Sequence, residues 1–215
     1  MTKMAELAVL VAQGLSDPAH VAYGLTEDIY PALIEADKAI LNFRPDANTA
    51  SSPITTVAGS KQSIPAGHLR LIDVPCNIDP SSGAELRDIY LKPKAELSPG
   101  WRTIAPVDVV ENYMFDDRNP TEFEVFPPVK AGRKLRVVTC VPFESYGTID
   151  ANTESKLPQS YDAAKVEWAL YRCYCRDNSP HRGRGLDHLR NFYQLLGVKG
   201  QRDLEASPKR GHQDQ

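Results

Sequence analysis

Residues 26–64 constrain the fold more than any other stretch, because a helix pattern, a helix stop and two strand patterns follow each other there without a gap. Apolar residues recur at helical spacing and predict an amphipathic helix over residues 28–42. Pro31 fits only the first turn of that helix, which favours Asp28 as its N-cap. Pro45 is expected to end the helix, because the residue before a proline is pushed out of the α region.

Two short strands are predicted next, at residues 54–58 and 61–64, on either side of Gly59 and Ser60. A glycine turn between two β-prone runs is typical of a hairpin. Lys61 follows this turn, but the upstream glycine and the following helix of a phosphate loop are missing. The opening stretch is therefore predicted to be a helix that leads into a β-hairpin.

Helix patterns occupy both ends of the chain. The first covers residues 3–15, and a second begins with Ser160 as N-cap and presents Ala164, Trp168, Tyr171 and Cys175 on one face. A last helix is expected to start near Pro180 and to stop at Gly197. The remaining residues, 198–215, have almost no apolar content, so on their own they are expected to be disordered.

The middle of the chain reads as β-structure, with turn signals at short intervals between β-prone runs at residues 69–74, 86–91, 112–115, 122–126 and 135–141. We therefore expect an α+β protein: a helical bundle formed by the N- and C-terminal helices, with an inserted antiparallel β module that is a small sandwich or barrel. The predicted divisions are 1–48 and 158–197 for the bundle, 49–157 for the β module and 198–215 for a flexible polar tail.

Composition and charge exclude only a few classes of function. The chain has 215 residues, 41% hydrophobic and 25% charged, so wholesale disorder is excluded. Its net charge of −3 gives no reason to expect generic nucleic-acid binding, although the residues from Lys156 onward carry eleven Lys and Arg against seven Asp and Glu. The four cysteines lack disulfide spacing, and no apolar run reaches the length of a signal peptide or a membrane span.

No convincing active site emerges from the motifs. Asp116 and Asp117 are the best adjacent carboxylates, but their DDRNP context explains them as turn residues. The five histidines are scattered without metal-ligand spacing, and His188 is expected to be solvated on the helix face opposite the leucines. The sequence therefore predicts no enzyme, no cofactor and no metal; the alternative kept open is a small metal-dependent hydrolase built on the two aspartates and a histidine.

Short ordered motifs across residues 26–197 resemble the head-to-tail adaptor, or connector, proteins of tailed bacteriophages with podophage-like particles. The motifs are Leu41-Asn-Phe-Arg-Pro-Asp-Ala47, Val57-Ala-Gly-Ser-Lys-Gln-Ser-Ile-Pro-Ala-Gly67, Leu69-Arg-Leu-Ile-Asp73, Tyr113-Met-Phe-Asp116, Phe123-Glu-Val-Phe-Pro-Pro128 and Ala169-Leu-Tyr-Arg-Cys-Tyr-Cys-Arg-Asp177. The resemblance implies a structural virion protein that forms a ring, usually twelvefold, between the portal vertex of the capsid and the tail. Another tail component, a tail-tube or nozzle subunit, is the main alternative.

The partners that this resemblance implies are the portal protein, a tail-tube or nozzle protein, and further copies of the chain, with genomic DNA passing through the channel at ejection without specific binding. No membrane is expected, and the protein is expected at the head–tail interface of the virion, assembled in the host cytoplasm. Cations near the C-terminus are the candidate residues for contact with an acidic protein partner: Arg182, Arg184, Lys199, Arg202, Lys209 and Arg210.

Overall fold

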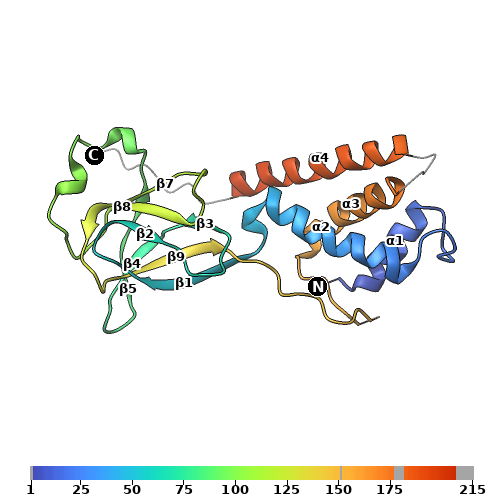
Figure 1. Ribbon diagram of the computed structural model, residues 1–215, viewed down its shortest axis with the longest axis horizontal. Helices are drawn as coiled ribbons and strands as arrows, with labels where there is room; N and C mark the ends of the chain where they lie inside the picture. Colours follow the sequence, from blue (N-terminus) through green and yellow to red (C-terminus); the bar gives the residue numbers. More distant parts are fainter. Residues whose placement is uncertain (1, 151, 177–181, 207–215) are drawn as a thin grey trace. The chain divides into compact units, whose positions relative to one another are not determined.

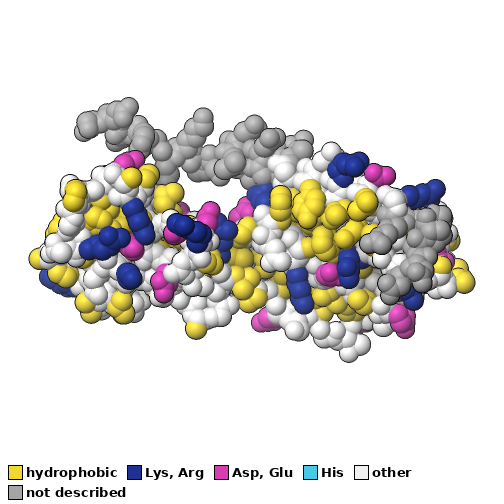
Figure 2. Space-filling model, turned by 45° about the horizontal axis from the view of Figure 1, so that its top comes forward, with side chains coloured by type: hydrophobic (Ala, Val, Ile, Leu, Met, Phe, Trp, Pro, Cys, Tyr) yellow, Lys and Arg dark blue, Asp and Glu magenta, His cyan; other side chains and the backbone are white. Residues whose placement is uncertain are grey.

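The computed structural model describes residues 2–150, 152–176 and 182–206 (Figure 1). The chain forms two compact units: a helical unit, Met1–Ala47 with Phe143–Gln215, and a β unit, Asn48–Pro142. Charged side chains of both signs are spread over the described surface of each, with hydrophobic side chains between them (Figure 2). The predicted α+β class, with helices at both ends and a β module in the middle, is confirmed. Residues 143–157, which the sequence analysis places with the β module, belong to the helical unit.

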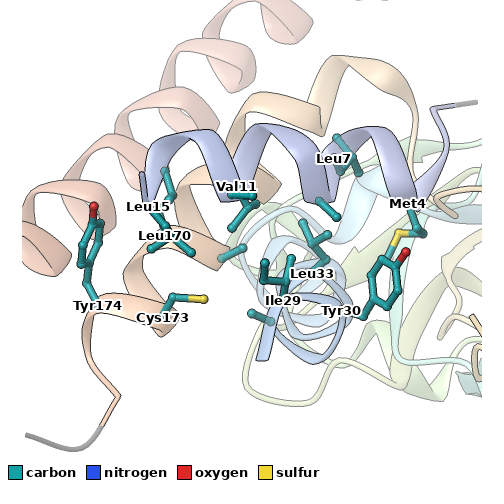
Figure 3. Packing of buried hydrophobic residues seen from close by; sticks show 14 residues of the cluster. Met4, Leu7, Val11, Leu15, Ile29, Tyr30, Leu33, Leu170, Cys173 and Tyr174 are labelled. Carbon is teal, nitrogen blue, oxygen red and sulfur yellow. The ribbon is translucent and has the colours of Figure 1, made fainter. Parts of the chain in front are cut away.

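Three helices of the helical unit share one apolar core. They are α1 (Met4–Gly14), α2 (Tyr30–Phe43) and α3 (Asp162–Tyr174). Figure 3 shows the labelled residues of α1 packed with those of α2 and α3, and the buried set includes Leu7, Val11, Ile29, Leu33 and Leu170. These positions repeat every three or four residues along each helix, so burial of one stripe accounts for the helices that the periodicity predicts.

The start of α2 differs from the prediction, whereas its end agrees with it. One π-helical turn, Leu25–Ile29, precedes the helix, and the Asp28 carboxylate accepts the backbone N–H of Gly24 at 2.9 Å. Asp28 is therefore not the N-cap of α2, although Pro31 does lie in its first turn. The helix ends at Phe43, two residues before Pro45, as the proline rule requires.

Helix α4 (Arg182–Ala206) continues past Gly197, so the predicted stop at that glycine and the predicted tail from residue 198 are wrong as far as Ala206. A single glycine costs a helix only about 1 kcal/mol, and residues 198–206 are rich in helix formers. Phe192 and Leu196 anchor α4 in a second core cluster with residues of α2 and α3. Residues 207–215, the rest of the predicted tail, lie outside the described residues.

Two sheets build the β unit (Figure 1). The first has the order β1 (Thr49–Thr55), β9 (Lys134–Cys140), β4 (Cys76–Ile78), β5 (Glu85–Asp88), and β3 (Arg70–Asp73) also pairs with β9. The second has the order β2 (Gly59–Ser63), β8 (Glu122–Val129), β7 (Asn112–Phe115), β6 (Tyr90–Leu91). All pairs are antiparallel except β6 with β7. Apolar side chains from both sheets form one core.

The predicted hairpin around Gly59 is wrong, because its two strands belong to different sheets. Strand β1 pairs with β9 along its whole length, and β2 pairs with β8. Thr56 turns the chain between them: its N–H donates to the carbonyl of Arg133 at 2.8 Å, and its hydroxyl donates to that of Lys130 at 2.7 Å. The turn lies at residues 56–58 and not at Gly59 and Ser60, which begin β2, and local turn chemistry could not tell which partner each strand would find.

The run at residues 86–91 likewise divides between the sheets, into β5 and β6. Ile89 lies between them with no exposed surface, and its N–H donates to the carbonyl of Pro75 at 2.9 Å. The predicted strand at 112–115 is confirmed as β7, and the turn around Asp116 joins it to β8. The three-residue strand β4 was not predicted, because it is too short to show alternation.

Candidate functional site

The six predicted cations do not form a compact cluster in the part of the chain that the structure describes. Four of the positions, 182, 184, 199 and 202, lie on α4, and the last two, Lys209 and Arg210, are outside the described residues. Arg184 is the one whose side chain is described, and it is exposed. Positions 184 and 199 are about 22 Å apart along the helix, from the rise of 1.5 Å per residue. Their role in binding a partner stays a prediction.

Asp116 and Asp117 are turn residues in ion pairs. Asp116 accepts the backbone N–H of Arg118 at 3.0 Å and pairs with its guanidinium at 3.2 Å, while Asp117 pairs with Arg70 at 2.6 Å. The hydrogen bonds from the Arg118 side chain and backbone lower the pKa of the Asp116 carboxyl. A carboxyl with a lowered pKa stays ionised at neutral pH and is a poor general acid.

His188 is only partly exposed and has protein partners, contrary to the prediction of a solvated side chain. Its ring stacks on Tyr174 with centroids 5.4 Å apart, and its Nδ1 lies 2.8 Å from a carboxylate oxygen of Glu167. Asn191 donates to the same oxygen at 3.2 Å. These contacts hold α4 against α3, so His188 is part of a helix–helix contact rather than a free histidine.

A buried ion pair at the centre of the helical unit was missed by the sequence analysis. Lys165 on α3 and Asp37 on α2 lie 2.6 Å apart, nitrogen to oxygen, and both side chains are inaccessible to solvent. Each residue interrupts an apolar helix stripe. Asp37 lies between Leu33 and Ile40 in the stripe of α2, and Lys165 lies between Tyr161 and Ala169 in the stripe that continues into α3. An acid in one stripe and a base in another is the signal that could have revealed the pair.

The same ion pair fastens the segment that leads from the β unit into α3. Tyr146 donates its hydroxyl proton to Asp37 at 2.5 Å, and Lys165 donates to the hydroxyl of Ser155. The backbone N–H of Lys156 donates to the Tyr146 oxygen at 2.9 Å. Burial, together with the bond to Asp37, raises the pKa of the Tyr146 phenol. Every charge here faces a protein partner, which suits a structural role.

A cavity of about 410 Å³ lies between α2 and α3. Two exposed ion pairs line it, Asp28 with Arg176 at 2.6 Å and Glu35 with Arg172 at 2.8 Å. Cys173 is also in its wall, but burial raises the pKa of that thiol to about 12, so it stays protonated and is a poor nucleophile. The Cys173 thiol is therefore not an activated nucleophile, and the carboxylates of Asp28 and Glu35 in this cavity are held in ion pairs.

Aromatic rings join α2, α3 and α4 at the surface of the helical unit. Phe43 and Tyr193 are 5.4 Å apart between centroids, Tyr193 contacts Phe192 at 5.3 Å, and Phe192 contacts Trp168 at 4.9 Å. Phe192 is buried, whereas Phe43 and Tyr193 are exposed. Exposed aromatic side chains that gather on one face are typical of a protein-binding surface.

The described residues contain no group of three or more His, Cys, Asp or Glu side chains that could hold a metal ion. Within the same residues, no helix is both long and apolar enough to cross a membrane. The features that the structure does offer are a buried polar network, ion pairs with exposed partners and a surface with exposed aromatic rings.

The model of the SU10 adaptor protein family matches residues 2–212 of the chain, which is nearly its whole length. A search of curated proteins finds no match. The chain therefore belongs to the SU10 adaptor protein family, in agreement with the phage adaptor resemblance of its motifs. Membership assigns it a phage adaptor role and makes it a component of the virion.

Proposed function

We propose that the protein is the subunit of a ring that joins the portal vertex of a phage capsid to the tail and forms a conduit for DNA during ejection. The family match over residues 2–212 is the observation that carries this proposal. On this proposal the protein is structural and not an enzyme, and its ring has the twelvefold symmetry that such rings usually share with the portal.

The helical unit supports self-association. A ring of identical subunits needs head-to-tail contacts, and such contacts use apolar surface that a single subunit leaves exposed. The aromatic surface of α2 and α4 supplies surface of this kind. The bundle is therefore proposed to form the ring.

The cations from Arg182 to Arg210 are proposed to meet an acidic surface of the portal. DNA is proposed to pass through the ring with weak contacts only, because tight phosphate pairing would hinder its movement. The tail-tube or nozzle protein would bind the opposite side of the ring.

The test is to mix the purified protein with its cognate portal and to image the product by negative-stain electron microscopy. The proposal expects a ring of density on one face of the portal, with one adaptor per portal subunit. Protein that stays monomeric in the presence of portal contradicts it.

A tail-tube or nozzle subunit is separated from an adaptor by deleting residues 207–215, which leaves all of α4 in place. Loss of portal docking supports the adaptor, and unaffected docking argues against capture of the portal by this segment.

The hydrolase alternative is tested by Asp116→Asn with Asp117→Asn: metal that is bound stoichiometrically and is lost in this variant would favour it. Both aspartates already have arginine partners, which speaks for the structural role.

A further inference from the structure

The outer side of α1 is an apolar stripe that the described residues of the helical unit leave about half exposed. Val9 and Leu10 are 53% and 49% exposed, although they lie in the middle of a helix whose other side is buried. Glu6 precedes them by three and four residues, so it lies on the same face of the helix. Its carboxylate makes no ion pair with any other residue that the structure describes. We call Glu6, Val9 and Leu10 the α1 stripe.

A second apolar surface lies on α4 and the end of α2. Leu186 is 56% exposed and Tyr193 is 46% exposed; they are seven residues apart and therefore share a helix face. Phe43 is 49% exposed and packs on Tyr193. Figure 2 shows that hydrophobic side chains gather on the described surface, with Lys and Arg side chains nearby. We call Phe43, Leu186, Arg190 and Tyr193 the aromatic face.

The charges of the two surfaces are complementary. Arg190 lies between Leu186 and Tyr193 on the same side of α4, and it pairs with Asp187 at 3.1 Å. Both partners of that pair are more than two thirds exposed, so it contributes little and can be exchanged for another at small cost. The α1 stripe has the opposite sign, because Glu6 is its charged member.

We propose that the α1 stripe of one copy of the chain docks on the aromatic face of the next copy, with Glu6 beside Arg190. The inference rests on the proposed ring and names the two surfaces that close it. A closed ring of identical subunits requires two different, complementary patches on each subunit. The helical unit presents two such patches on different helices, and an apolar helix stripe that packs on an apolar face is a common mode of recognition.

Two variants test the proposal, one for each surface. Val9→Glu with Leu10→Glu places charge in the α1 stripe, and Leu186→Glu with Tyr193→Glu places charge in the aromatic face. All four positions are exposed helix positions where Glu is a good helix former, so each variant is expected to keep its fold, as far-UV circular dichroism will show. Each is expected to weaken self-association by about tenfold or more, because it introduces charge into the apolar centre of the contact.

Mixing the two variants gives the sharpest result. Each retains one intact surface, so an equimolar mixture is expected to form a one-to-one dimer that neither forms alone, measured by analytical ultracentrifugation.

A further pair of variants exchanges the charges of the two surfaces. Glu6→Lys and Arg190→Glu are each expected to weaken assembly, and the two changes in one chain are expected to restore it.

The control carries two apolar-to-Glu changes elsewhere in the helical unit, Val21→Glu with Leu195→Glu, both at exposed positions outside the two surfaces. It is expected to assemble as the wild type does. A ring that forms normally from either surface variant, or a mixture that stays monomeric, overturns this proposal while the adaptor ring stands. A wild type that does not self-associate, even on its portal, contradicts the ring itself.

Discussion

The two units both have exposed ion pairs, but only the helical unit has a buried one among the residues that the structure describes. The helical unit buries an ion pair, Asp37 with Lys165, whereas each described ion pair of the β unit has at least one partner that is a third or more exposed. The buried polar side chains of the β unit are neutral, and the Asn77 amide makes three hydrogen bonds. Backbone ladders fix the register of a sheet, but a helix packed by aliphatic side chains can slide or rotate. We infer that the buried pair fixes how α2 and α3 meet.

The largest effect is expected from Lys165→Met, which leaves the Asp37 carboxylate buried without its cation. The free energy of unfolding of the helical unit should fall by about 3–5 kcal/mol. The chain has two tryptophans, Trp168 in the helical unit and Trp101 in the β unit. Urea unfolding followed by Trp168 fluorescence in a Trp101→Phe background therefore reports this unit alone.

The matched control for this change is the double variant Asp37→Leu with Lys165→Met, which removes both charges and is expected to recover most of the lost stability. A single Lys165→Met variant with the wild-type urea midpoint would show that the ion pair is not buried. It would also remove the contrast between the two units.

Asn77→Ala is the corresponding change in the β unit. The Asn77 amide donates to the carbonyls of Arg87 and Val110 at 2.9 and 2.8 Å, and it accepts the N–H of Val110 at 2.8 Å. Its loss leaves buried backbone groups unpaired and should cost about 2–3 kcal/mol. Trp101 fluorescence in a Trp168→Phe background measures it, and exposed Asn119→Ala is the control, with a change of about 0.5 kcal/mol or less.

Alkaline pH should destabilise the helical unit through Tyr146. The folded state raises the pKa of this phenol, whereas the unfolded chain releases the proton near pH 10. Above that pH the unfolded state binds fewer protons than the folded one, so the free energy of unfolding falls with rising pH, by at most about 1.4 kcal/mol per pH unit. In Tyr146→Phe this part of the slope should vanish, as urea titrations at pH 9, 10 and 11 would show; an unchanged slope contradicts the assignment.

Two glycines of α4 give the smallest and most local test. A Cβ at Gly185 would lie 2.7 Å from the Cys175 sulfur and 3.3 Å from the Tyr174 Cβ, whereas none of the described atoms lies within 4 Å of one at Gly197. Gly185→Ala should therefore cost about 1 kcal/mol net, because overpacking outweighs the gain in helix propensity. Gly197→Ala should gain up to about 1 kcal/mol, since the helix continues on both sides. A destabilising Gly197→Ala would indicate that the helix ends there, as the sequence predicted.

Much of the helical unit could be predicted from sequence, because burial of one stripe leaves a periodic signal. The same method was only half right for α3: of the face it predicted, Ala164, Leu170 and Cys173 are buried, whereas Trp168, Tyr171 and Cys175 are only partly buried. The face of α3 that is buried also includes Lys165, Ala169 and Tyr174, which were not predicted. A pattern that counts lysine as polar cannot find a lysine whose partner is on another helix.

The sheets were predictable as strands but not as pairs. Turn chemistry found the hairpin of β7 and β8, but it placed a second hairpin turn at Gly59 and Ser60, which are the first residues of β2. Strand pairing depends on residues far apart in the chain: Thr49 of β1, for example, lies opposite Cys140 of β9. The two candidate binding surfaces could not be predicted from the sequence for a related reason. Whether Leu10 or Tyr193 is exposed depends on which helices cover the other sides of α1 and α4.

The two ends of the β unit are joined to each other. Asn48 donates its side-chain amide to the carbonyl of Val141 at 2.9 Å, and the N–H of Val141 donates back to the carbonyl of Asn48 at 3.1 Å. A domain whose first and last residues touch can be removed or exchanged with little loss of chain entropy in its host. A short glycine linker in place of residues 48–142 should therefore leave the helices able to fold. The β unit is thus an insertion whose two connections to the helical unit start from neighbouring residues.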